Sequence, residues 1–263
     1  MKLNSKGHVL PSVNNTPGYR KVAETIEGEI LKGNLKVGDL LPIESDLAAQ
    51  LGVNRSTIRE GIRALENSGL LRRVEAKRLV IAAPDATMIA RANSRAMGLN
   101  RVTFQELWEL QMELEPFAAQ LAAERINEDQ SHRLLATIKE LEDNLANDEA
   151  VIQHDIAFHN LIADATGNRA LCLSAAPIGM LLFSATEDLY RNVPRARHRL
   201  LEAHRAIAEA IVRHDAPGAR GWMAKHIQDF RRGYEAGGLP LDAPISFDAR
   251  AFGQEHSSAA SQH

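Results

Sequence analysis

The sequence predicts a mainly α-helical protein, with an N-terminal winged helix-turn-helix domain followed by an all-α helical bundle. The order helix, short helix, turn, helix, hairpin fills the first 84 residues, and no convincing strand pattern follows between about residues 87 and 236. A length of 263 residues suits two modest domains. The predicted organisation is a flexible leader (1–17), a winged-helix domain (18–84), a helical domain (85–238) and a flexible tail (239–263).

Composition and charge narrow the class of protein and of partner. The chain is 44% hydrophobic and 25% charged, which is typical of soluble globular proteins, and it has no run of 18 apolar residues. No continuous apolar segment marks a signal peptide, and the single Cys172 forms no internal disulfide, so we expect a cytoplasmic protein with no membrane partner. Residues 1–84 hold 13 Lys and Arg against 9 Asp and Glu, whereas the remainder holds 18 against 25. This asymmetry indicates an anionic partner for the first domain only.

The elements of the first domain follow from periodicity and punctuation. A first amphipathic helix ends at Gly33, and a turn with short extended structure leads to a second, short helix that ends at Gly52. Asn54 is a plausible N-cap for the third helix, and Gly69 lies just past its end. Two short extended runs around a charged tip then predict a hairpin, and the region of Pro84 predicts a linker.

The second domain reads as consecutive helices. Thr103 and Glu106 form a capping box at the start of a long helix, in which Pro116 should produce a kink or a break. Further helices are expected at about 129–146, 149–165, 169–190, 197–214 and 216–235.

The third helix of the first domain carries the residues that suit DNA recognition. In this motif the second helix places its N-terminal residues against base edges in the major groove. Here that end reads "NRSTIRE", and Arg55, Ser56, Thr57 and Arg59 can face outward while the apolar residues face the core. Arginine pairs with guanine, serine and threonine bond phosphates or bases, and the free N–H groups of the first turn suit a phosphate. An ordinary solvated helix face is the alternative for the two arginines taken alone.

Four titratable residues of the second domain share an unusual position, since each lies on the apolar face of its predicted helix: Asp155, His159, His204 and His226. Buried polar groups without partners are destabilising, and a metal ion would satisfy all four. One carboxylate and three imidazoles suit zinc, nickel or another first-row divalent ion. From the residues alone, an ordinary side-chain pair explains the positions of Asp155 and His159 as well as a metal site does. No sequence pattern places His204 and His226 beside that pair.

The stretch "ILKGNLKVGDLLPIESDLAAQLGVNRSTIREGIRALENSGLLRR" resembles the N-terminal domain of the GntR family of bacterial transcription regulators. The resemblance implies that Arg55 and Arg59 read bases, while Asn54, Ser56 and Thr57 support them or hold phosphates. Ser45 stands where the family usually has an arginine, and Lys77 lies in the wing where the family usually has Gly-x-Gly. Both remain candidate DNA-binding positions, and the departures imply an altered operator or a weaker wing contact.

The helical domain resembles the FCD ligand-binding domain of the FadR-like subfamily, through "ELEPFAAQLAAERI", "DIAFHNLIADATGN", "EAHRAIAEAI" and "MAKHI". Metal-binding members use one Asp and three His at the positions of Asp155, His159, His204 and His226. Gln111 stands where the family often has an arginine that holds an effector carboxylate. The resemblance therefore implies a divalent metal cofactor, zinc first, and makes Gln111 a candidate effector-binding residue.

Together these features predict a ligand-responsive, sequence-specific DNA-binding transcription regulator, a repressor rather than an enzyme. A homodimer would bind a double-stranded operator, and a small organic or sugar acid would be its effector. One alternative is a metal-dependent hydrolase fused to a DNA-binding module, because a metal bound by Asp and three His could activate water. Another is a DNA-binding protein whose helical domain only dimerises.

Overall fold

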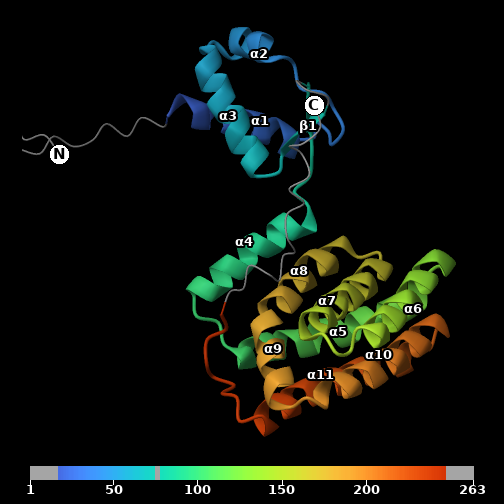
Figure 1. Ribbon diagram of the computed structural model, residues 1–263. Coiled ribbons are helices and arrows are strands. Elements are labelled where there is room, and N and C mark those ends of the chain that lie inside the picture. Colours follow the sequence, from blue (N-terminus) through green and yellow to red (C-terminus); the bar gives the residue numbers. More distant parts are fainter. Residues whose placement is uncertain (1–16, 75–77, 247–263) are drawn as a thin grey trace, which may run out of the picture. The chain divides into compact units, whose positions relative to one another are not determined.

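The computed structural model describes residues 17–74 and 78–246, and the chain divides into two compact units at Asp85 and Ala86 (Figure 1). Each unit has its own hydrophobic core. Among the described residues no single helix is long and apolar enough to cross a membrane, although the bent pair 169–181 and 183–192 passes that test by length and composition.

In its described residues, the first unit contains three helices and a two-stranded antiparallel sheet. The elements are α1 (Gly18–Leu31), α2 (Glu44–Leu51), α3 (Arg55–Asn67), β1 (Leu71–Val74) and β2 (Arg78–Ile81). Leu71 pairs with Ile81 across the hairpin, and the segment before α2 lies along β2, where the Leu41 amide donates to Leu79 at 2.9 Å. The helix-turn-helix and hairpin predicted from the sequence are confirmed.

The core of the first unit depends on a close approach of α1 to α3. Ile58 and Ile62 of α3 are fully buried, and they pack with Val22 of α1. Gly61 of α3 lies against α1, and a Cβ atom at this position would lie 2.7 Å from Val22 Cγ1. The absence of a side chain at Gly61 therefore permits the helix packing that fixes the orientation of α3.

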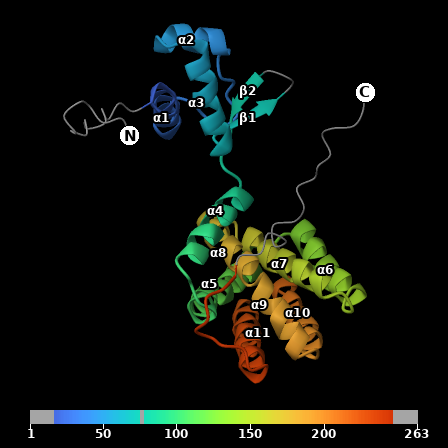
Figure 2. The ribbon, with the colours of Figure 1, turned by 60° about the vertical axis from the view of Figure 1, so that its left-hand side comes forward.

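The second unit is an all-α bundle, as predicted. Its helices are α4 (Ala86–Leu99), α5 (Phe104–Arg125), α6 (Glu128–Asp143), α7 (Asp148–Ala165), α8 (Arg169–Leu181), α9 (Phe183–Asn192), α10 (Ala196–Val212) and α11 (Ala216–Ala236). Helix α11 packs beside α5 and α10, and α7 packs against α5, α6 and α8 (Figures 1 and 2). This arrangement brings the inner faces of α5, α7, α10 and α11 into one core.

Side-chain caps define where several of these helices begin. Thr103 and Glu106 form the predicted capping box at the start of α5, with the Glu106 carboxylate accepting from the Thr103 amide at 2.8 Å. Asn127 forms a second capping box with Gln130 at the start of α6, and the Asn147 side chain caps α7 by accepting from the Ala150 amide. Helix α5 continues through Pro116 to Arg125, so no break occurs at that proline.

Helix α4 was not predicted, because no element was assigned between the linker at Pro84 and the capping box at Thr103. Its buried face consists of small residues, Ala90 and Ser94, which are both fully buried and lie four positions apart. Such residues allow α4 to lie close to α8, but they give no stripe of large apolar side chains. The spacing of apolar residues along the sequence therefore did not predict this helix.

The predicted single helix at 169–190 is two helices, α8 and α9, bent by 44°. Leu181, Leu182 and Phe183 are all buried at the bend. A straight helix turns successive residues by about 100° and does not bury three consecutive side chains on one face. Leu182 itself is neither glycine nor proline, but Pro177 and Gly179 lie within five residues before it. Both residues weaken a helix, so the sequence held a local signal that the prediction of one helix did not use.

The start of the predicted flexible tail packs on the bundle. The amide of Gln105 donates to the Leu241 carbonyl at 2.9 Å, and the amide of Ile245 donates to the Val102 carbonyl at 2.9 Å. Leu239, Leu241 and Ile245 also pack against the core of the second unit. Residues 239–246 thus cover the N-terminal end of α5 rather than forming a flexible segment, while residues 247–263 lie outside the described part.

Candidate metal centre and DNA-binding surface

Three helices bring the four predicted metal ligands together. Asp155 and His159 lie one turn apart on α7, His204 comes from α10, and His226 comes from α11. One oxygen or nitrogen atom from each of the four side chains lies within 4.8 Å of those of the other three. The question that the sequence left open, how His204 and His226 could reach α7, is answered by the packing of α10 and α11 in this bundle.

The donor atoms converge on the Asp155 carboxylate. Its Oδ1 atom lies 3.1 Å from His204 Nε2 and 3.4 Å from His159 Nε2. The centroid of the His226 ring lies 5.0 Å from that of His204 and 5.4 Å from that of His159. Phe158 stacks on the His204 ring at 3.9 Å and holds its plane. The arrangement is a compact N₃O donor set rather than a local helix pair.

Several buried atoms in this set have no well-oriented hydrogen bond, although they lie close to one another. These atoms are Asp155 Oδ1 and both ring nitrogens of His204. His204 is fully buried, so water does not compensate for the missing partners. A divalent cation among the four side chains would satisfy these lone pairs, and the donor types fit zinc or a similar ion.

Burial and neighbouring charge set the protonation of the cluster. Burial lowers the pKa of His204 and, together with the adjacent imidazoles, lowers the pKa of His226 further. Both rings are therefore neutral near pH 7, which is the form that binds a metal. Burial alone would raise the pKa of Asp155, but its contacts with His159 and His204 outweigh burial and hold that pKa well below its usual range.

Glu115 of α5 joins the cluster, and the sequence did not single it out. One of its carboxylate oxygens contacts His159 Nδ1, and the other accepts a hydrogen bond from Gln111 Nε2 at 3.1 Å. Burial would lower the pKa of His159, but the negative charges of Glu115 and Asp155 raise it to about 10. A signal was present, because Leu107, Gln111 and Glu115 share one helical stripe in which polar residues are unexpected.

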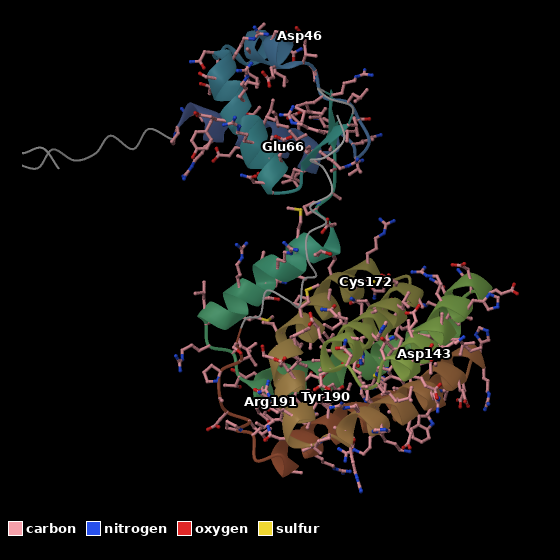
Figure 3. The ribbon with its side chains drawn as sticks, viewed as in Figure 1. Asp46, Glu66, Asp143, Cys172, Tyr190 and Arg191 are labelled. Atoms are coloured by element: carbon pink, nitrogen blue, oxygen red, sulfur yellow. The ribbon has the colours of Figure 1, made fainter. Side chains whose placement is uncertain are left out.

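Gln111, the candidate effector residue, is buried and lies in the wall of a cavity beside the donor set. The cavity also reaches Asp155, His159 and His226. Tyr190 of α9, labelled in Figure 3, lines the same cavity, and burial raises the pKa of its phenol well above the usual value. A molecule in this cavity would therefore touch Gln111 and the donor set together.

In the first unit, Asn54 organises the start of α3. Its Oδ1 accepts hydrogen bonds from the Thr57 amide at 2.8 Å and from the hydroxyls of Ser56 and Thr57 at 2.7 and 2.8 Å. Asn54 thus acts as the predicted N-cap, and the two hydroxyl protons point back at the cap. Because their protons are donated to Asn54, the hydroxyl oxygens of Ser56 and Thr57 can accept hydrogen bonds only from donor groups of DNA. A phosphate oxygen is itself an acceptor and would have to bind backbone amides of α3 instead.

The two arginines predicted to read bases are exposed on α3, and Arg59 is already paired. Its Nε donates to a Glu44 carboxylate oxygen of α2 at 2.7 Å. Glu44, which the sequence analysis did not mention, thus holds the guanidinium near the start of α2. Ser45 lies next to it, partly exposed, and its hydroxyl donates to Asp46 Oδ1 at 3.3 Å.

A hollow with a basic lining lies at this end of the first unit. It is lined in part by Arg55, Arg59, Arg73 and Arg78, and by Ser45. Arg73 was not predicted, and it pairs with Glu66, labelled in Figure 3, at 2.8 Å. Lys77, the remaining predicted position, lies outside the described residues.

Comparisons with known proteins agree with this arrangement. Residues 18–81 match the family described as bacterial regulatory proteins, gntR family, and residues 106–229 match the FCD domain. The HTH-type transcriptional regulator LutR of Bacillus subtilis is 28% identical over 212 residues, which cover 78% of this chain and 97% of that protein. The HTH-type transcriptional repressor NanR of Escherichia coli is 25% identical over 221 residues, which cover 82% and 84%.

A solved structure described as Streptococcus agalactiae GntR is similar in fold and in sequence. It aligns with a TM-score of 0.59 and 28% identity, covering 81% of this chain and 99% of the other. The matched families and the named relatives are transcriptional regulators and not enzymes, so the hydrolase alternative is set aside.

Proposed function

The chain belongs to the GntR family of bacterial regulatory proteins and carries an FCD domain, so it is a transcription regulator, and we propose that it is a metal-dependent, acid-responsive repressor. The observation that carries the proposal is the set of Asp155, His159, His204 and His226, whose donor atoms lie within 4.8 Å of one another. His204 is buried and the other three are partly buried. The same helical bundle holds the cavity that reaches this set.

These four side chains would hold the ion, which we take to be zinc, with nickel or another first-row divalent ion as alternatives. When bound, the ion supplies a positive centre to which a carboxylate can coordinate. The protein itself excludes water by burying His204 and orients the rings through Phe158 and Glu115. A small organic or sugar acid would enter the cavity at Gln111 and reach the ion.

DNA recognition would use the exposed start of α3. Arg55 and Arg59 would contact base edges, while Asn54, Ser56 and Thr57 would hold the helix end against the phosphates. Ser45 and Lys77 would contribute at the margins of that surface. A homodimer in the cytoplasm would place two such helices on a pseudo-palindromic operator.

Regulation would follow from linkage between the two sites. An effector that binds two dimer geometries with different affinity shifts the population of the geometry that fits DNA. The relative NanR is named a repressor, which supports assigning repression here as well. In this account the acid lowers the affinity of the zinc-loaded protein for its operator.

The test is operator binding by the full chain, measured by fluorescence anisotropy on DNA taken from upstream of its own gene. Zinc-loaded protein should bind this DNA specifically, and at least one sugar acid should release it. His159→Ala should lose the response to the acid, whereas His132→Ala should keep it, because His132 is exposed on α6. Identical binding with and without every acid, by protein that retains zinc, would remove the regulatory proposal.

A further inference from the structure

The open hollow in the first unit takes its cationic lining from three different elements. Arg55 and Arg59 come from α3. Arg73 comes from β1, and Arg78 is the first residue of β2. The hairpin lies beside α3 (Figure 2), so the guanidinium groups of both gather at one end of the unit. The hollow has a volume of about 630 Å³, which is room for a nucleotide-sized group rather than for a single small ion.

The acidic side chains in the hollow do not balance these four charges. The described lining contains two carboxylates, Glu44 and Asp46, against the four guanidinium groups. Glu44 pairs with Arg59 at 2.7 Å, and neither Arg55 nor Arg78 has an ion-pair partner among the described residues. A concave surface with one dominant sign of charge concentrates its field and attracts the opposite charge. The hollow therefore suits an anionic group.

Arg78 combines a fixed backbone with an exposed side chain. The three residues of β2 that follow it are buried. On one side β2 pairs with β1, and on the other it is held by the segment that leads into α2, where the Leu41 amide donates to the Leu79 carbonyl at 2.9 Å. A ligand in the hollow would therefore meet an available guanidinium on a rigid strand.

Arg73 is held in the lining by Glu66. Its Nε lies 2.8 Å from one carboxylate oxygen of Glu66, and one terminal nitrogen lies 3.4 Å from the other. A guanidinium carries five N–H groups in a rigid fork, so this pair leaves the second terminal nitrogen for a ligand. Glu66 is not among the described residues that line the hollow. The pair thus orients Arg73 without blocking it.

The groups around the hollow favour a phosphate of DNA as the anion. Ser56 and Thr57 donate their hydroxyl protons to Asn54, so they offer no donor to a phosphate oxygen. Arginine instead meets a phosphate through two parallel N–H···O bonds. When a recognition helix enters the major groove, the phosphates that flank the groove pass beside it. Guanidinium groups on the hairpin next to α3 are placed to meet them.

We propose that Arg73 and Arg78 bind phosphate groups of one DNA strand where that strand crosses the hollow between α3 and the hairpin. The two strands of the hairpin then contribute affinity that does not depend on base sequence, while Arg55 and Arg59 supply the readout. This inference rests on the proposed function, because it takes α3 to lie in the major groove. It adds two DNA-binding residues and gives them a role different from that of the arginines on α3.

The test is the salt dependence of DNA binding by the full chain, measured by fluorescence anisotropy. A duplex from upstream of its own gene and a scrambled duplex of the same composition are titrated between about 50 and 200 mM KCl. Each phosphate contact contributes about 0.9 to the slope of log K against log salt concentration. Arg78→Gln and Arg73→Gln should each reduce that slope by about 0.9 and weaken both duplexes by the same factor, on the order of fivefold.

Three further variants separate a phosphate contact from other roles. Arg78→Lys should keep the wild-type slope, because an ammonium group still neutralises a phosphate. Arg63→Gln removes an arginine of α3 that is not in the described lining of the hollow, and it should leave the slope unchanged. Arg55→Ala should weaken the upstream duplex more than the scrambled one, since base contacts discriminate between sequences. The replaced side chains are all exposed, so every variant should keep the melting temperature of the wild-type chain.

Two results would overturn the inference: a wild-type slope in either glutamine variant of the hairpin, or a loss of affinity in them that is confined to the upstream duplex. Binding of inorganic phosphate to the DNA-free chain that Arg78→Gln abolishes, with wild-type DNA binding by that variant, would assign the hollow to a small anion and overturn it as well. If Arg55→Ala and Arg59→Ala also leave DNA binding unchanged, the proposed placement of α3 fails. If those two variants lose specific binding as expected, only the role of the hairpin fails.

Discussion

At the scale of single residues, Glu115 lines the cavity and contacts one of the four proposed metal ligands, His159. Its two carboxylate oxygens face Gln111 and His159, so it fixes which ring nitrogen of His159 points at the donor set. Carboxylates in this position orient a metal-binding imidazole and raise its basicity. In the proposed site, Glu115 would thus act on the ion through His159, without coordinating it.

Replacing Glu115 with glutamine should weaken zinc binding by about 10–100-fold, because the shape is kept and the charge is lost. The measurement is competition with a chromophoric zinc chelator. Glu113→Gln is the matched control, since Glu113 is exposed on the same helix. Equal zinc affinity in Glu115→Gln and wild type would show that Glu115 does not position His159.

The proposed contact of α3 with DNA bases makes a second prediction about residues. Arg55→Ala and Arg59→Ala should each cost about 1–3 kcal/mol of specific operator binding if both arginines make good base contacts. The measurement is a titration of operator DNA at fixed salt. Arg63→Ala removes an exposed arginine about one turn beyond Arg59 on α3 and should change affinity little. Unchanged affinity in both first variants would contradict the assignment.

The sequence predicts the four proposed metal ligands, but not Glu115, which contacts one of them. Asp155 and His159 were visible as an i, i+4 pair, whereas His204 and His226 were joined to them only through the family resemblance. Their meeting depends on how α10 and α11 pack, which no local pattern encodes. Glu115 and Glu44 were missed because each is informative only beside its partner, His159 or Arg59.

At the scale of elements, the contact between α1 and α3 rests on one glycine. Gly61→Ala would place a Cβ atom 2.7 Å from Val22 Cγ1 and 3.1 Å from the Tyr19 carbonyl oxygen. Overpacking of this kind costs about 1–3 kcal/mol, more than the helix propensity gained, so the variant should lower the stability of the first unit. Guanidinium unfolding of the full chain measures the change.

The control for this prediction lies on α1. Gly28→Ala meets nothing within 4 Å and should keep or raise stability by up to about 1 kcal/mol through helix propensity. A Gly61→Ala variant as stable as Gly28→Ala would show that the two helices adjust freely, and the packing argument would be incorrect.

The capping box at the start of α5 gives a pH-dependent prediction. Hydrogen bonds from the backbone and hydroxyl of Thr103 lower the pKa of Glu106 below its ordinary value of 4.5. A lowered folded-state pKa means that this stabilisation is present above about pH 4.5 and is lost as the pH falls through the lowered value. The difference in Tm between wild type and Glu106→Gln should therefore shrink between about pH 6 and pH 3.

Glu113→Gln serves again as the control, because Glu113 is exposed and outside the cap. Its difference from wild type should not follow the same pH profile. A constant difference for Glu106→Gln across this range would show that the charge of Glu106 adds nothing to the cap.

Several helices that were predicted correctly begin at residues whose side chains cap them, and no capping signal was used for the elements that were missed. Thr103 and Asn54 mark helix starts by side-chain chemistry that operates within one turn. Helix α4 depends instead on its contacts with α8, and the bend at Leu182 follows Pro177 and Gly179, which the prediction did not use. Residues 239–246 likewise became ordered through backbone bonds to the start of α5, which composition alone does not reveal.

At the scale of the whole molecule, the two structural units also differ in the sign of their net charge. The excess of basic residues lies in the first 84 positions, and the arginine-lined hollow belongs to that unit. The excess of acidic residues lies in the unit that holds the donor set. The fold class could be predicted because helix order and charge asymmetry are properties of the sequence itself, whereas the cavity chemistry required the packed bundle.

The central claim is that Asp155, His159, His204 and His226 hold a divalent ion, and zinc stoichiometry tests it most directly. Full-length protein loaded with zinc, dialysed and analysed by mass spectrometry should hold about one zinc per chain. His132→Ala should hold the same amount, while His204→Ala and Asp155→Ala should lose it and remain helical by circular dichroism. Wild-type protein without zinc, or a His204→Ala variant with as much zinc as wild type, would contradict the account.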